Sequence, residues 1–141
     1  MATLVDTNIL VYRFDPRRLD KQARARRFLA EGLARDSVRL PHQALLEFVP
    51  AATKPVKDRA PLLSPIEAWH ELEKLLTDFP VLYPTDEVLR AAVRGATLHR
   101  LSWFDAHLWA YAHCYGIEEI ASEDFQHGRI YGSVRATNPL L

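Results

Sequence analysis

The feature that most constrains the fold of this chain is the alternation of short apolar runs with longer segments of helical periodicity. The short runs predict strands at residues 2–6, 37–40, 80–84, 117–122 and 134–137. Between them, the residue pattern predicts helices over 8–12, 19–35, 42–53, 64–77, 85–98 and 103–115. Strands that alternate with helices in this way are typical of a parallel sheet. We therefore expect an α/β fold.

Several element boundaries rest on local signals. Ser64 and Glu67 have the spacing of a capping box, with proline at the first helical position between them. Gly116 is placed to end the helix that begins at residue 103. Pro50 is expected to kink the helix over 42–53 or to mark its end. Residues 54–63 contain two prolines and predict a flexible loop.

Length and composition indicate one globular domain over residues 1–141, with no repeat or linker to divide it. The net charge is zero, but residues 13–39 carry nine basic and four acidic side chains. A basic segment beside an acidic site suits a nuclease, and it is equally typical of a solvated helix face.

Cysteine usage and the amino terminus limit the setting in which we expect the chain to act. Cys114 is the only cysteine, so no disulfide can form within the chain and no cysteine-based metal motif exists. The sequence lacks the pattern of a signal peptide and any apolar run of bilayer-spanning length. We expect a cytoplasmic protein without a membrane partner.

Four acidic residues that are far apart in sequence are the candidates for a functional site. Asp6 follows the first predicted strand and Asp124 follows the fourth, and ligand sites in such sheets lie at the carboxyl ends of strands. Glu47 and Asp105 lie on predicted helices. Carboxylates gathered at one place repel one another unless a cation lies between them. Because oxygen ligands suit Mg²⁺ or Mn²⁺, these acids predict a metal-dependent phosphodiesterase.

Each acid also has a plausible structural role. Asp6 could cap a helix, Asp105 could form a capping box with Ser102, and Glu47 could face solvent. Asp124 could form a turn, and its neighbour Glu123 is a rival for the role of ligand.

Other chemistries are poorly supported by the sequence. The six histidines are scattered, and the chain has no glycine-rich phosphate loop. A phosphatase that begins with an aspartate after its first strand would place a second aspartate at position 8 and a lysine late in the chain. This chain has Asn8, and its last lysine is Lys74.

Four motifs in order resemble those of the PIN-domain ribonucleases, and most closely the VapC-type toxins of bacterial toxin–antitoxin pairs. The resemblance covers nearly the whole chain and includes a closing Asn138-Pro139. It implies a three-layer α/β/α sandwich with a central parallel sheet of about five strands. The motifs are Val5-Asp6-Thr7-Asn8-Ile9-Leu10, a mid-chain helical Glu47, Trp103-Phe104-Asp105-Ala106, and Ser122-Glu123-Asp124-Phe125-Gln126-His127-Gly128.

The resemblance also implies a site and an activity. Endonucleolytic RNA cleavage would use Mg²⁺ or Mn²⁺, with Asp6 and Asp105 as primary ligands and Asp124 completing the set. Glu47 would bind a second ion or orient the attacking water. The supporting residues implied are Thr7, Asn8 and Ser122. One departure is His127, where relatives often carry an acid.

The implied partners are an RNA substrate, a cognate antitoxin protein and a second copy of the chain as a homodimer. The loop over 54–63 is the candidate for holding the substrate. Two alternatives stay open, namely a PIN nuclease of RNA processing that is not a toxin and a non-catalytic PIN-like binding module. Degenerate modules usually lose acids from the cluster, whereas this chain keeps all four.

Overall fold

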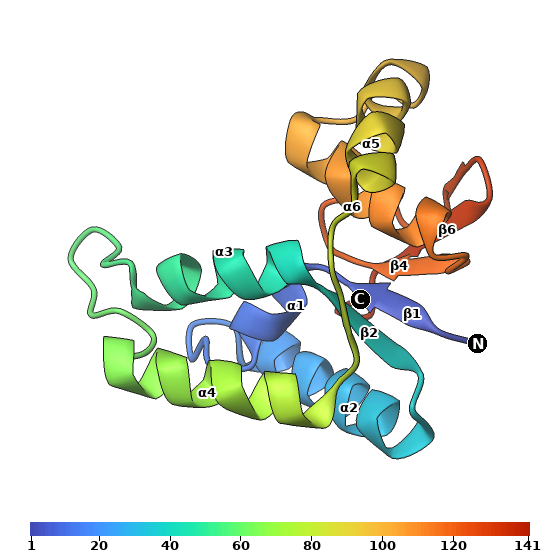
Figure 1. Ribbon diagram of the computed structural model, residues 1–141. Helices are drawn as coiled ribbons and strands as arrows, with labels where there is room; N and C mark the ends of the chain where they lie inside the picture. The colour runs from blue at the N-terminus through green and yellow to red at the C-terminus, as the bar shows by residue number, and fades with distance from the viewer.

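The computed structural model describes residues 1–141 and contains one six-stranded sheet in the order β3-β2-β1-β4-β6-β5 (Figure 1). The first five strands in this order are parallel, and β5 pairs antiparallel with β6 at the edge. The strands are β1 (Thr3–Val5), β2 (Val38–Pro41), β3 (Val81–Leu82), β4 (Glu119–Ala121), β5 (Ile130–Tyr131) and β6 (Val134–Thr137).

Six helices connect and cover the strands, and none of them is both long and apolar enough to span a bilayer. They begin and end within two residues of the positions expected from the sequence. The helices are α1 (Thr7–Tyr12), α2 (Leu19–Arg35), α3 (His42–Thr53), α4 (Pro65–Asp78), α5 (Asp86–Leu98) and α6 (Trp103–Cys114).

The sheet separates two apolar cores, because neighbouring residues of a strand point to opposite faces. Leu4 and Ile120 pack in the core under α5 and α6. Val5 and Ala121, the next residue of each strand, pack in the core formed with α1, α2, α3 and α4. Figure 1 shows these two helical layers on either side of β1 and β4. The expected three-layer α/β/α sandwich is therefore confirmed.

Two details differ from the sequence-based expectations. The short edge strand β5 was not predicted, because two residues give no readable periodicity. Pro50 does not end α3, which continues to Thr53. Proline removes the hydrogen bond to the carbonyl four residues earlier, and that residue, Leu46, is 63% exposed, so water can replace the lost donor.

Helices α5 and α6 approach each other closely at Gly95. A β-carbon at this position would lie 2.5 Å from Cε3 of Trp109, well inside van der Waals contact. The Trp109 ring is itself buried, and its Nε1 donates a 2.9 Å hydrogen bond to the carbonyl of Tyr131. This packing fixes α6 against the sheet, and α6 carries Asp105 in its first turn.

Candidate metal centre

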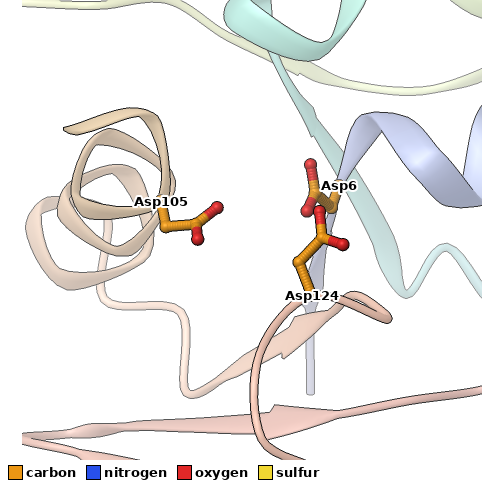
Figure 2. Close-up of side chains that lie close together, drawn as sticks. All are labelled: Asp6, Asp105 and Asp124. Atoms are coloured by element: carbon orange, nitrogen blue, oxygen red, sulfur yellow. The ribbon is translucent and has the colours of Figure 1, made fainter. Parts of the chain in front are cut away.

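Three of the predicted carboxylates come together at the carboxyl ends of the central strands. Asp6 follows β1, Asp124 lies in the turn after β4, and Asp105 lies in the first turn of α6. One carboxylate oxygen from each lies within 4.8 Å of the others. In Figure 2, Asp105 points from its helix toward the Asp6 and Asp124 carboxylates on the opposite side. Residues from the two ends of the chain thus share one site.

Asp6 is held rigidly by its neighbours and is only 8% exposed. Its Oδ1 accepts a 2.7 Å hydrogen bond from the amide of Thr7, so it does cap α1 as one interpretation suggested. Its Oδ2 accepts a 2.7 Å hydrogen bond from the hydroxyl of Ser122. Because the two carboxylate oxygens of Asp6 accept from different donors, Asp6 can cap the helix and still lie in the cluster.

Asn8 and Ser122 connect Asp6 to Asp124. The Asn8 amide donates to Oδ2 of Asp6 at 3.3 Å and to Oδ2 of Asp124 at 3.1 Å. The fully buried Ser122 hydroxyl also accepts a 3.0 Å hydrogen bond from the backbone amide of Asp124. Two neutral side chains therefore set the spacing of two carboxylates.

Glu47 lies beside this cluster rather than within it. It lines the same cavity as Asp6 and Asp124 but is not one of the three mutually close carboxylates. Its Oε2 accepts a 3.0 Å hydrogen bond from the hydroxyl of Thr7. Its Oε1 accepts a 2.9 Å hydrogen bond from Gln43, one helical turn earlier. Sequence reasoning missed Gln43, although its i,i+4 spacing from Glu47 was a readable signal.

Asp105 directs its carboxylate toward the cluster from the first turn of α6. The Ser102 hydroxyl accepts a 3.3 Å hydrogen bond from the Asp105 amide and so caps α6. The reciprocal bond from the Ser102 amide that would complete a capping box is not formed there, whereas α4 has both halves through Ser64 and Glu67. The helix start therefore places the Asp105 side chain at the site, with the Ser102 hydroxyl beside its carboxylate.

Glu123, the rival of Asp124, is engaged elsewhere. Its carboxylate accepts hydrogen bonds from the hydroxyl of Tyr12 and, at 2.7 Å, from the ammonium of Lys21. Burial raises the pKa of Glu123, but these two donors outweigh burial and hold the pKa below its usual range. The turn after β4 thus directs one acid to α1 and α2 and the next acid to the cluster.

The cluster carries negative charge that no side chain neutralises. None of the seven ion pairs in the structure involves Asp6, Glu47, Asp105 or Asp124. The pKa of Asp6 is raised to about 6, mainly by burial and also by the charges of Asp124 and Asp105, against the lowering effect of the Ser122 and Thr7 hydrogen bonds.

The pKa of Asp105 is also raised, mainly by burial. The Ser102 hydroxyl opposes this shift, and the charges of Asp124 and Glu47 add to it. All the candidate ligands are carboxylate oxygens, the donors that hard divalent cations prefer. The donor set and its uncompensated charge therefore fit Mg²⁺ or Mn²⁺.

The raised pKa of Asp6 predicts that metal-free protein loses stability as pH rises from about 4 to about 7. The folded state disfavours the ionised carboxylate, so the penalty is absent below the unfolded pKa and complete above the folded one. Its upper size is about 3 kcal/mol. In EDTA at about pH 8, Asp6→Asn should unfold at higher urea concentration than wild type, and the difference should vanish near pH 4. Asp86→Asn, an exposed acid on α5, should show no such pH-dependent difference.

The cluster opens into a cavity of about 360 Å³ that includes a cationic residue. Of the nine basic residues over 13–39, only Arg17 lines this cavity. It donates to the buried Asp15 from Nε at 2.8 Å and from Nη2 at 2.7 Å. This pair was not identified from the sequence, in which an Asp-Pro-Arg turn resembles any other polar turn.

His127 has a structural role where related motifs often have an acid. Its Nδ1 accepts a 2.9 Å hydrogen bond from the backbone amide of Asn138. The side chain therefore ties the loop after Asp124 to the segment that follows β6, and it is not among the residues that line the acidic cavity.

The fold and the site together define an α/β sandwich with an acidic centre at the ends of its two central strands. The chain belongs to the PIN-domain family, because the family model matches residues 3–133. No curated protein sequence matches the chain significantly.

Several solved structures share this fold over nearly their full length. One is the DNA-bound VapBC complex from Salmonella typhimurium, with 14% identity, a TM-score of 0.71 and coverage of 99% of both chains. A toxin–antitoxin complex from Klebsiella pneumoniae has 17% identity, a TM-score of 0.69 and 98% coverage of both. FitAB bound to an IR36 DNA fragment has 16% identity and a TM-score of 0.73, with coverage of 99% of this chain and 96% of that one.

Proposed function

We propose that this protein is a metal-dependent endoribonuclease that hydrolyses RNA phosphodiester bonds. The observation that carries the proposal is the convergence of Asp6, Asp105 and Asp124 within 4.8 Å, with no cationic side chain paired to them. Such a centre fits one or two Mg²⁺ or Mn²⁺ ions. When bound, the ion supplies positive charge for the phosphoryl oxygens and lowers the pKa of the attacking water.

The protein side chains have separate roles in this proposal. Asp6, Asp105 and Asp124 hold the ion, while Asn8 and Ser122 fix the distance between the first and last of them. Glu47 lies in the same cavity, fixed by Thr7, and is placed to orient the attacking water or to bind a second ion. A scissile phosphate would enter the cavity, which Arg17 also lines.

We further propose that the protein is the toxin of a toxin–antitoxin pair and that its partner is a cognate antitoxin. The structures that share its fold include the toxin–antitoxin complexes named above, which supports this assignment. Self-association as a homodimer is part of the proposal, and α5 exposes Leu89, Val93 and Leu98 as an apolar surface for it. A non-catalytic binding module is less well supported, because three of the four acids line the cavity and the fourth, Asp105, lies close to Asp6 and Asp124.

The test of the nuclease is cleavage of structured RNA by purified protein with Mg²⁺ or Mn²⁺, with EDTA, and with Asp6→Asn. We expect cleavage with either ion and none with EDTA or the variant. Calorimetric measurement of Mn²⁺ binding distinguishes an assay that lacks the right RNA substrate from a protein that has no metal site. Metal binding without cleavage of any RNA would direct attention to the substrate, whereas neither binding nor cleavage would overturn the proposal in favour of a binding module.

The toxin role has its own test. Expression of the wild-type chain alone should arrest growth, expression of Asp6→Asn should not, and co-expression of the product of a short adjacent open reading frame should restore growth. RNA cleavage in vitro without growth arrest would instead favour a PIN nuclease of RNA processing.

A further inference from the structure

A second cavity adjoins the acidic one and has the opposite charge. Its volume is about 320 Å³, and three residues, Arg17 among them, line both cavities. The charged side chains that line it are Arg17, Lys54 and Arg59, with no acid among the lining residues. The acidic cavity and the basic cavity therefore meet at Arg17, which lines both.

The cations of this basic cavity are positioned by the chain before any ligand arrives. The Nε and Nη2 atoms of Arg17 donate to the buried Asp15, which leaves Nη1 without a partner. The charge of Arg59 also acts on Asp15, since it contributes to the lowered pKa of that carboxyl, although the hydrogen bond from Arg17 contributes most. One buried acid therefore positions Arg17 and also feels the charge of Arg59.

The loop that forms one wall of the cavity is ordered by backbone hydrogen bonds. The amide of Arg59 donates to the carbonyl of Val56 at 2.7 Å, which closes a tight turn with Asp58 at a positive φ of 63°. The amide of Leu63 donates to the carbonyl of Ala52 at 3.0 Å, which ties the loop to the end of α3. The segment predicted to be a loop thus forms a wall beside the site, held by these two backbone hydrogen bonds.

The basic cavity also has apolar lining residues, here termed its apolar floor. Six of its eleven lining residues are hydrophobic, among them Val56 and Leu62. Lys54 also lines a neighbouring cavity that contains Glu47. Cations and apolar side chains in one cavity match the chemistry of a nucleotide, which has an anionic phosphate and a flat apolar base face.

We infer that this basic cavity is a subsite that binds one nucleotide of single-stranded RNA next to the scissile phosphate. Arg17, Lys54 and Arg59 bind the flanking phosphate, and the apolar floor receives the base. The inference rests on the proposed nuclease function, which it extends by assigning residues to substrate binding. RNA is favoured over an acidic peptide because the cavity combines cations with a base-sized apolar floor beside a carboxylate centre suited to phosphate chemistry.

The experiment measures binding of a fluorescein-labelled single-stranded RNA of about ten nucleotides by anisotropy. The protein carries Asp105→Asn so that the probe is not cut. Adding Lys54→Ala and Arg59→Ala should weaken binding about tenfold. The slope of log affinity against log salt should fall in magnitude by about 0.7 for each phosphate that the variant no longer neutralises. Lys57→Ala, on the same turn but outside the cavity lining, is the matched control and should leave the affinity unchanged.

A second measurement tests the apolar floor. The RNA affinity of the Asp105→Asn protein should drop when one base is replaced by an abasic ribose at a single position of the probe. Adding Val56→Ser should reduce that difference. An equal response of the proteins with and without Val56→Ser at every position would show that the floor does not receive a base.

The outcomes separate this inference from the proposed function. RNA affinity within about twofold of the control in the double variant would overturn the subsite, even if wild type cleaves RNA. A reduction in RNA affinity of about tenfold in the double variant, with a wild-type protein that neither cleaves RNA nor binds Mn²⁺, would leave the subsite standing and overturn the nuclease proposal. Binding of a polyglutamate peptide that depends on Lys54 and Arg59, with RNA binding that does not, would assign the cavity to a protein ligand instead.

Discussion

Replacing Asp105 by asparagine is expected to lower the rate of RNA cleavage by at least about 100-fold. The substitution removes one of the three carboxylates that lie within 4.8 Å of one another, and with it an anionic ligand for the ion. The helix should be retained, because Ser102 caps it through the backbone amide of residue 105 rather than through the side chain. Single-turnover cleavage at saturating Mn²⁺ measures the effect.

The matched control for this variant is Asp86→Asn. Asp86 also lies in the first turn of a helix, but it is exposed and lies outside the site. Its replacement should leave cleavage unchanged and alter stability by at most about 0.5 kcal/mol. If Asp105→Asn cleaved RNA at the wild-type rate, Asp105 would be only a residue at a helix start.

The largest expected effect on stability is that of Gly95→Ala, with a loss of about 2 to 3 kcal/mol. The new methyl group would lie 2.5 Å and 2.6 Å from two carbons of the Trp109 ring. That ring cannot easily move, because it donates a hydrogen bond to Tyr131 and packs against the rings of His99 and His113, whose centroids each lie 4.8 Å from its own. Alanine favours helix by only about 1 kcal/mol over glycine, so the clash dominates.

Urea denaturation of Gly95→Ala against wild type measures this loss, with Thr97→Ala as the control. Thr97 is exposed on the same helix, so its replacement should change stability by at most about 0.5 kcal/mol. A more stable Gly95→Ala protein would show that α5 and α6 separate readily. Because α6 carries Asp105, the substitution should also disturb the metal site. The Mn²⁺ affinity of Gly95→Ala should therefore be lower than that of Thr97→Ala.

Much of the fold was readable in the sequence, because its elements are marked by strong local signals. Ser64 caps the start of α4, and Gly116 follows the end of α6. Neither signal depends on distant contacts. Acids directly after apolar strands could likewise be assigned to the edge of a parallel sheet. The convergence of Asp6 with Asp124 follows from that rule once β1 and β4 are neighbours.

The parts that could not be predicted depend on side-chain contacts between distant segments. Nothing in the local sequence shows that Glu123 binds Lys21 while Asp124 joins the cluster. The hydrogen bond from Thr7 to Glu47 spans 40 positions and requires α1 and α3 to pack together.

The position of β4 between β1 and β6 has a consequence for synthesis of the protein. A nascent chain that ends before residue 119 leaves one edge of β1 unpaired and lacks both Ser122 and Asp124. In such a chain Asp6 has been translated, whereas its partners Ser122 and Asp124 have not. The centre can assemble only after residues 119–124 have left the ribosome, so shorter translation products should lack the proposed nuclease activity.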